Sequence, residues 1–426
     1  MRRYLIDLSP LRLSAAYRRL WTGDLVASGG SQLAAVALPY QVYTQTGSSL
    51  QVGLIGLAAL GPLLLGSLTA GVFADAFDRR RLLVVSQLGA AACCVALALL
   101  SASGKPPLAA LYVLAALLAF AGSIESPVRN AVIPGLVGIE KVPAASALNQ
   151  IVDQTSQIAG PAVAGLLLAG LGIWETYAVG AAGFGLAVAT VVALPPLRPV
   201  DGAAAPGWRA LVDGLSFARR QPVLLSTFAV DLNAMVFGMP RALFPALAVG
   251  TFEVGPRGLG LLYAAPAAGA LLAAVGSGWV TSVRRQGLAV MASVVAWGLS
   301  IAVFGLVPGE LFWLALLLLA AAGAADVISA VFRNTIMQEV TPDGMRGRMA
   351  SLHIAVVTSG PRIGDVEAGV VASATSVGFS VVSGGVICVA GVALLHLLSP
   401  ALARYERSPR REAPRRTAID GPTDAT

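Results

Sequence analysis

The chain has 426 residues, of which 56% are hydrophobic and only 12% are charged, and its formal net charge is +7. Soluble domains contain about 25% charged residues, so this composition excludes a water-soluble globule and indicates lipid as the main solvent. The positive charge does not indicate nucleic-acid binding, because the basic residues lie in short clusters between apolar stretches. No cleaved signal peptide is expected, since no apolar run with a small-residue cleavage site precedes Trp21.

Twelve apolar segments follow one another along the chain, and each is long enough to cross a bilayer core, which requires about 20 residues. The fifth and the eleventh are the least apolar. Their approximate ranges are 20–44, 49–74, 82–102, 107–128, 145–170, 172–196, 222–249, 256–281, 287–307, 310–332, 348–375 and 378–399. We therefore expect an all-α integral membrane protein with twelve transmembrane helices.

Nearly all of the 29 Lys and Arg residues fall within helices or in loops on one side of the predicted membrane. Only Lys105 and Arg257 fall in loops on the other side, which is a strong positive-inside signal. We therefore expect a multi-pass protein of the cell inner (plasma) membrane with both termini in the cytoplasm.

Landmarks of the first half recur in the second at a nearly constant offset of about 200 residues, as expected for two parallel six-helix repeats around a central cavity. The matched pairs are Val128-Arg129-Asn130 with Phe332-Arg333-Asn334, Gly160-Pro161 with Gly360-Pro361, Leu38-Pro39 with Phe244-Pro245, and Gly71 with Gly276. The halves should span 1–196 and 222–399. A cytoplasmic linker with a short amphipathic segment is expected over 197–221, and a disordered cytoplasmic tail over 400–426.

The loop after the second segment carries a glycine, an aspartate four residues on, and then a basic pair. These residues are Gly71, Asp75, Arg79 and Arg80. The pattern resembles the signature loop of the major facilitator superfamily. The resemblance implies the major facilitator fold of two pseudo-symmetric six-helix bundles, and a gating set made of these four residues and Arg129. Ala76 and Asp78 depart from the family pattern, which implies a weaker or differently paired latch, and the basic residues alone would also suit an ordinary positive-inside loop.

Three further stretches, Val36–Tyr43, Pro127–Pro134 and Gly360–Asp365, resemble the enterobactin-exporter-like branch of that superfamily. The resemblance covers nearly the whole chain. It implies a proton-driven exporter of a siderophore, an antibiotic or a drug, without fixing which. Two glycine–proline steps, Gly160-Pro161 and Gly360-Pro361, resemble a reduced form of the family's antiporter element and are expected to bend or closely pack their helices.

Polar side chains recur on single faces of two predicted helices. Asp24, Ser28 and Gln32 are spaced four residues apart in the first segment, and Asn149, Asp153 and Gln157 in the fifth. A polar stripe that faced lipid would be costly, so both should line the cavity. Asp24 lies about one turn into its helix, where an interfacial cap is the competing interpretation.

The seventh segment holds Asp231, Asn233 and Arg241 as further cavity candidates. Arg241 is predicted to lie in mid-helix, where it could bind an anionic group of a substrate. The alternative is a fixed structural pair with Asp24, Asp231 or Asp326.

Other ionisable residues lie in the fourth, tenth and eleventh segments. A local ion pair is expected between Glu125 and Arg129. Asp326 is a candidate protonation site. Arg362 and Asp365 should compensate each other, which leaves Glu367 either as a proton carrier or as an inert group near outer water.

These features predict a secondary active transporter, proton-coupled and exporting a small organic molecule by alternating access. The alternatives are a proton-independent or uptake transporter, and a non-transporting membrane receptor. An enzyme is not expected, because no Ser/His/Asp grouping, HExxH, Walker or dinucleotide motif is present. The expected partners are a small-molecule substrate, protons and lipid, with no cofactor, metal or nucleic acid, and the protein should be a monomer.

Overall fold

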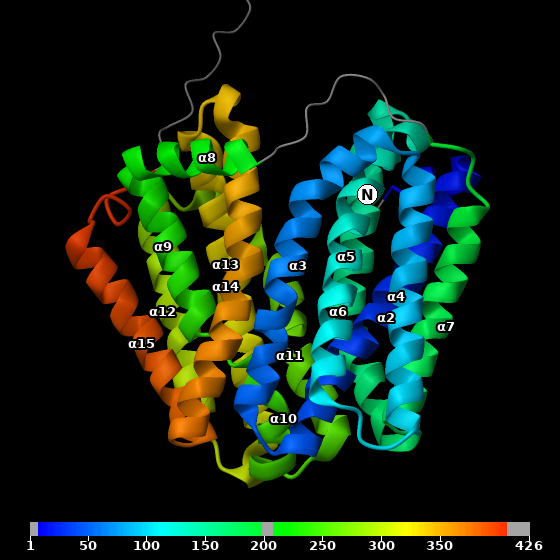
Figure 1. Cartoon of the computed structure of the whole chain (residues 1–426). Coiled ribbons are helices and arrows are strands. Elements are labelled where there is room, and N and C mark those ends of the chain that lie inside the picture. Colours follow the sequence, from blue (N-terminus) through cyan, green and yellow to red (C-terminus); the bar gives the residue numbers. More distant parts are fainter. Residues whose placement is uncertain (1–6, 198–207, 407–426) are drawn as a thin grey trace, which may run out of the picture.

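The computed structural model describes residues 7–197 and 208–406 (Figure 1). Within them, the twelve predicted segments correspond in order to eleven continuous helices and one interrupted helix. The continuous helices are α2 (Ala15–Thr46), α3 (Ser49–Ala76), α4 (Arg79–Ala102), α5 (Leu108–Val137), α6 (Val142–Gly170), α7 (Ile173–Val192), α11 (Gly255–Val275), α12 (Gln286–Phe304), α13 (Phe312–Val340), α14 (Arg346–Ala374) and α15 (Val377–Leu398).

The seventh predicted segment is the interrupted one. Helix α9 (Pro222–Phe237) ends at Gly238, and the chain continues through the short turns η3 (Arg241–Leu243), α10 (Phe244–Ala246) and η4 (Leu247–Thr251). The prediction that Arg241 lies in mid-helix is therefore wrong. Gly238 and Pro240 together favour the break, because glycine has a low helix propensity and proline lacks a backbone N–H and crowds the preceding helical turn. A proline alone does not end a helix in this chain, since Pro161 and Pro361 lie inside α6 and α14.

Nine helical segments in the described residues are long and apolar enough to cross a membrane. Helices α2, α6 and α14 fall short of that measure, and two of them are the fifth and eleventh predicted segments. These three carry the polar stripes and ionisable residues noted in the sequence. A helix shielded from lipid by its neighbours can carry such residues, so low hydropathy is tolerated in these three helices.

Serine or aspartate side chains cap the starts of four long helices, α2, α3, α4 and α15. Gly47 ends α2 in the left-handed conformation with φ 63°, which favours glycine, and the Ser48 side chain then accepts a hydrogen bond from Gln51 N at 3.4 Å. Two residues are thus enough to reverse the chain between α2 and α3. At the start of α4 the Asp78 carboxylate accepts from Arg80 N at 2.9 Å.

Helices α2–α7 pack together, as do α9–α15, and the two groups meet mainly where α3 contacts α14 and α6 contacts α11. Helix α8 (Trp208–Arg220) lies across one end of the bundle and α10 lies near the other (Figure 1); we call these the α8 end and the α10 end. The close approaches between the groups lie toward the α10 end. A Cβ atom on Gly165 would be 3.0 Å from Gly260 Cα, and one on Gly369 would be 2.8 Å from Ser49 O.

Two segments that the sequence predicts as a linker and a tail pack against the helices. Amphipathic α8 packs on the start of α14, where a Cβ on Gly214 would be 2.7 Å from Arg348 O. The start of the predicted disordered tail is ordered, because Leu402 is fully buried against α12 and Tyr405 Oη donates to Glu339 Oε2 at 2.9 Å. Residues 198–207 and 407–426, which hold the rest of both predictions, lie outside the described residues.

Candidate functional site

Two adjoining chambers lie between the two groups of helices. The wide chamber has a volume of about 960 Å³ and the deep chamber about 420 Å³. Seven residues line both chambers and so mark their junction, and the polar ones among them are Gln32, Gln157 and Arg362. Helices α2, α6 and α14 all begin at the α8 end. In each of these helices, the residues that line the wide chamber come earlier in the sequence than those that line the deep chamber. The deep chamber therefore lies nearer the α10 end.

The predicted polar stripes of α2 and α6 reach these chambers. Ser28 and Asp153 line the wide chamber, and Gln32 and Gln157 line both. Gly160 fits the close-packing prediction, because a Cβ there would be 2.6 Å from Gln32 Cβ. Small size at Gly160 therefore lets α6 approach α2 where the two stripes meet.

Asp24 lies behind the stripe and forms an ion pair across the first half. Its Oδ1 accepts from Arg129 Nη1 of α5 and from Ser28 Oγ at 3.3 Å. The predicted local pair also exists in looser form, with Glu125 Oε1 lying 3.9 Å from Arg129 Nη1 and accepting from Gln87 Nε2 at 3.0 Å. One guanidinium therefore serves two carboxylates, and no hydrogen bond or ion pair involving Asp153 is found in the described part of the chain.

The second half contains a matching cluster. Arg333 Nη2 of α13 lies 2.8 Å from Asp231 Oδ1 of α9 and 3.6 Å from Asp326 Oδ1. Asp231 and Arg333 are almost fully buried, whereas the Asp326 side chain is 31% exposed and lines the deep chamber. Again one guanidinium serves two carboxylates. Asp231 is therefore in a fixed pair and lines neither chamber.

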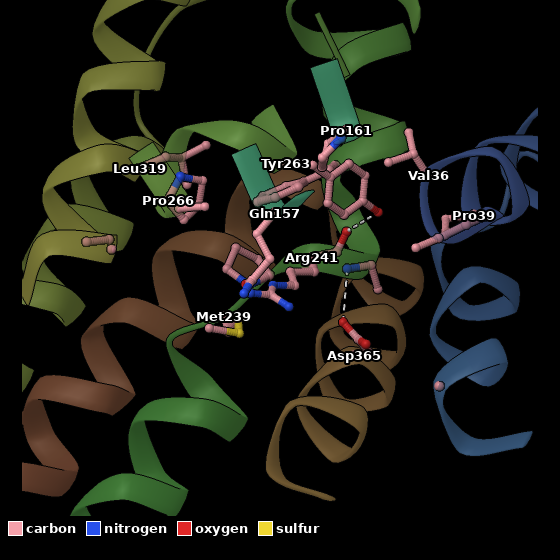
Figure 2. A pocket seen from close by; sticks show the side chains of 18 of the residues that line it. Val36, Pro39, Gln157, Pro161, Met239, Arg241, Tyr263, Pro266, Leu319 and Asp365 are labelled. Carbon is pink, nitrogen blue, oxygen red and sulfur yellow. Dashed lines mark hydrogen bonds between the residues drawn. The ribbon is translucent and has the colours of Figure 1, made fainter. Parts of the chain in front are cut away.

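The helix interruption forms one wall of the deep chamber. Trp297 Nε1 donates to Gly238 O at 2.8 Å, and Tyr263 Oη donates to Arg241 O at 3.2 Å. Asp365 Oδ1 of α14 accepts from Ala242 N at 3.1 Å (Figure 2). Three side chains thus satisfy backbone groups that the broken helix leaves unpaired. Non-helical backbone at membrane depth is tolerated where it is buried or lines a cavity, and here it does both.

Several sequence expectations for this wall need correction. Arg362 and Asp365 do not form an ion pair within the described structure, because Asp365 is used to hold the turn after Pro240. Arg241 forms no ion pair with Asp24, Asp231 or Asp326; their partners are Arg129 and Arg333. Tyr263 and Trp297 were missed, since an aromatic residue in an apolar segment gives no signal of its own.

Two further cavity candidates lie outside both chambers. Asn233 donates through Nδ2 to Cys388 O at 2.8 Å and packs against Gly391, so it ties α9 to α15. Glu367 is half-buried on α14 beyond Asp365 and lines neither chamber. Gly360 lies close to α9, where an added Cβ would be 3.0 Å from Met235 Cβ, and Pro361 follows it inside α14.

The predicted gating residues lie toward the α8 end. Gly71 is in the last turns of α3, and Arg79 and Arg80 begin α4. Arg79 donates through Nη1 to Ala131 O at 3.1 Å, which ties the start of α4 to α5. The Asp75 side chain is outside the described residues, so its predicted latch has no structural description.

Comparison with known proteins agrees with this architecture. A family described as transmembrane secretion effector matches residues 6–417. The enterobactin exporter EntS of Escherichia coli O157:H7 is 29% identical over 419 residues, which cover 98% of this chain and 99% of the relative. EntS of Citrobacter koseri is also 29% identical, over 95% of this chain and 97% of the relative.

Solved transporters share the fold at low identity. The nucleoside transporter NupG aligns with 91% of this chain and 98% of its own, with a TM-score of 0.73 at 13% identity. A bacterial homologue of the iron transporter ferroportin in its inward-facing state covers 91% of this chain and 98% of its own, with a TM-score of 0.62 at 17% identity. The relatives are transporters and not enzymes. On its sequence match, supported by its fold, the chain belongs to the transmembrane secretion effector family and is a multi-pass transporter of the major facilitator type.

Proposed function

We propose that this protein is a secondary active exporter that uses a proton gradient to expel a small organic molecule by alternating access. It acts as a monomer in the inner membrane with both termini in the cytoplasm, as its Lys and Arg distribution favours. In this orientation the α8 end faces the cytoplasm. The wide chamber then receives substrate from the cytoplasm, while the contacts near the α10 end close the opposite side.

The observation that carries proton coupling is the charge balance around Arg129. Asp24 and Glu125 share this one guanidinium, and the unpartnered carboxylate Asp153 lines the same chamber. A net charge out of bulk water is costly by several kcal/mol. The three carboxylates exceed the single guanidinium in charge, and binding one proton reduces this excess of negative charge. Protonation therefore changes the relative free energy of the inward- and outward-facing states.

The way in which the two halves meet supports the proposal of alternating access. Their glycine-mediated contacts, at Gly165 with Gly260 and at Gly369 with Ser49, lie toward the α10 end. Separating these contacts and closing the α8 end would expose the same chambers to the other side. The predicted signature-loop set of Gly71, Asp75, Arg79 and Arg80 lies where that closure would occur, which is the proposed place for its latch.

Enterobactin is the first substrate to test, because the curated relatives named above are enterobactin exporters. Purified protein in liposomes with an imposed pH gradient should move enterobactin against its concentration gradient. Glu125→Gln and Asp24→Asn should abolish gradient-driven accumulation but retain exchange of labelled for unlabelled substrate, since exchange needs no net proton movement.

Asp343→Asn is the matched control, because Asp343 pairs with Arg346 on an exposed turn. It should transport like the unmodified protein. Enterobactin movement that is equal with and without the pH gradient would refute coupling and favour a proton-independent carrier. Binding of enterobactin without any movement would favour the receptor alternative.

A further inference from the structure

Two guanidinium groups that form no ion pair within the described residues line the deep chamber. They belong to Arg241, on the turn after the helix interruption, and to Arg362 of α14. Within the described residues, every carboxylate that forms an ion pair does so with another basic residue. The two guanidiniums are near enough to act on each other electrostatically. Arg241 is exposed to the chamber and Arg362 is partly exposed, so both guanidiniums can contact a ligand there. Like charges held close together repel each other, and an anion placed between them relieves that repulsion.

The two carboxylates near these arginines, Asp365 and Asp326, have other partners. Asp365 accepts from Ala242 N, and Asp326 lies 3.6 Å from Arg333. Both carboxylates lower the cost of two arginines in one chamber without occupying the donor groups of Arg241 and Arg362. These donors remain free for a ligand.

The backbone around Arg241 is held while its side chain extends into the chamber. Tyr263 donates to the Arg241 carbonyl and Asp365 accepts from the next N–H (Figure 2). Trp297 donates to the carbonyl of Gly238. Pro240 also fixes its own φ angle. A donor on a preorganised backbone loses less entropy when it binds, which favours a specific contact.

The remaining wall suits a flat apolar body. Tyr263, Trp297, Pro266 and Leu319 line the deep chamber together with the amides Gln154 and Gln157. The partly exposed rings of Tyr263 and Pro266 offer apolar surface to a ligand, whereas Trp297 and Leu319 are almost fully buried, and the amides can contact polar substituents. We propose that the deep chamber is a binding subsite for an amphipathic organic anion, with its acidic group between Arg241 and Arg362 and its ring system on this wall. The inference deepens the proposed export function and rests on the chambers being its substrate site.

The test compares two ligands that share one body. Naphthalene-2-sulfonate is anionic at pH 7, and naphthalene-2-sulfonamide is its neutral counterpart. Calorimetric titration of the full-length protein in lipid nanodiscs, without any pH gradient, should give a dissociation constant at least about tenfold lower for the sulfonate, since hydrogen bonds to charged groups contribute about 1.5–3 kcal/mol.

Substitutions of the chamber residues test which side chains bind the sulfonate group. Arg241→Gln and Arg362→Gln should each weaken sulfonate binding by about tenfold and leave sulfonamide binding unchanged. Arg241→Lys should retain part of the preference. Asp326→Asn removes a negative charge from the same chamber and should strengthen sulfonate binding, a change of opposite sign that damaged folding would not produce. Arg257→Gln, at an exposed position outside both chambers, is the control and should change neither affinity.

Equal affinities for the two ligands would overturn the subsite, as would no sulfonate binding at 1 mM or a loss of both ligands in the arginine variants. Gradient-driven transport without any preference for the sulfonate would refute the subsite and leave the proposed export intact. A sulfonate preference without gradient-driven transport would instead refute the proton coupling.

Discussion

Asp24 of α2 and Arg129 of α5 form an ion pair that has a counterpart in the second half of the chain. There, Asp231 of α9 lies 2.8 Å from Arg333 of α13. In each half the first long helix supplies the aspartate and the fourth supplies the arginine. The same kind of ion pair therefore joins the corresponding helices in both six-helix groups, and we call each of these two pairs a clamp.

The clamp predicts a specific pattern of stability. Arg333→Met would leave Asp231 buried without its cation and should lower the free energy of unfolding by about 3–5 kcal/mol. The double variant Asp231→Leu with Arg333→Met should regain most of that loss, because an apolar pair of similar volume carries no desolvation penalty. Unfolding in mixed micelles measures both. Additive losses in the double variant would contradict a direct pair.

A second prediction concerns the contact of the two halves. A Cβ on Gly260 would be 3.1 Å from Gly165 Cα, so Gly260→Val should push α11 away from α6. Spin labels at the exposed Ser103 and Ser376, one from each half at the α10 end, should then report a longer distance by pulsed electron resonance. Gly170→Val is the control, because nothing lies within 4 Å of the added atom. An unchanged distance in Gly260→Val would show that this contact does not hold the α10 end closed.

A third prediction concerns the turn after the helix interruption. Asp365→Ala removes the acceptor for Ala242 N and leaves that buried donor unpaired, at a cost of about 1–3 kcal/mol. Hydrogen exchange of the segment 239–247 should therefore become faster. Asp365→Asn retains a carbonyl oxygen at the same place and should restore most of the protection. Equal exchange in Asp365→Ala and the unmodified protein would mean that the turn is held by other contacts.

A feature of the fold or the site could be predicted when a short stretch of sequence determines it. The helix order and the repeat follow from hydropathy and short motifs, and the family match confirms the superfamily assignment. The pairing of Asp24 with Arg129 was missed, although Arg129 and Arg333 had already been matched as repeat equivalents. Matching Asp24 with Asp231 as well would have suggested two equivalent pairs. Helix crossings, which decide what a buried arginine touches, have no local signature in a sequence.

The helix interruption shows a different kind of limit. Gly238 and Pro240 are standard signals of a helix break, yet the apolar character of 222–249 outweighed them. The turn persists because Trp297, Tyr263 and Asp365 satisfy its backbone from three other helices. Such tertiary support cannot be deduced from the segment itself. It is also what turned Asp365 from an expected partner of Arg362 into a support for the Arg241 turn.

The last prediction concerns Asp78, which stands where the family's loop has a glycine. Its carboxylate accepts from Arg80 N at 2.9 Å and from Leu197 N at 3.2 Å, so it caps α4 and also ties the chain after α7 to that cap. Asp78→Gly should lower the free energy of unfolding by about 1 kcal/mol, because glycine costs only a few tenths of a kcal/mol as a helix cap but the lost bond to Leu197 N adds about 0.5–1.5 kcal/mol. Asp78→Asn keeps an acceptor oxygen and should lose only a few tenths of a kcal/mol. Thermal unfolding in detergent measures both changes, and sulfonate binding in the deep chamber should be unaffected. A loss as large in Asp78→Asn as in Asp78→Gly would mean that the negative charge at this helix start matters more than the hydrogen bonds.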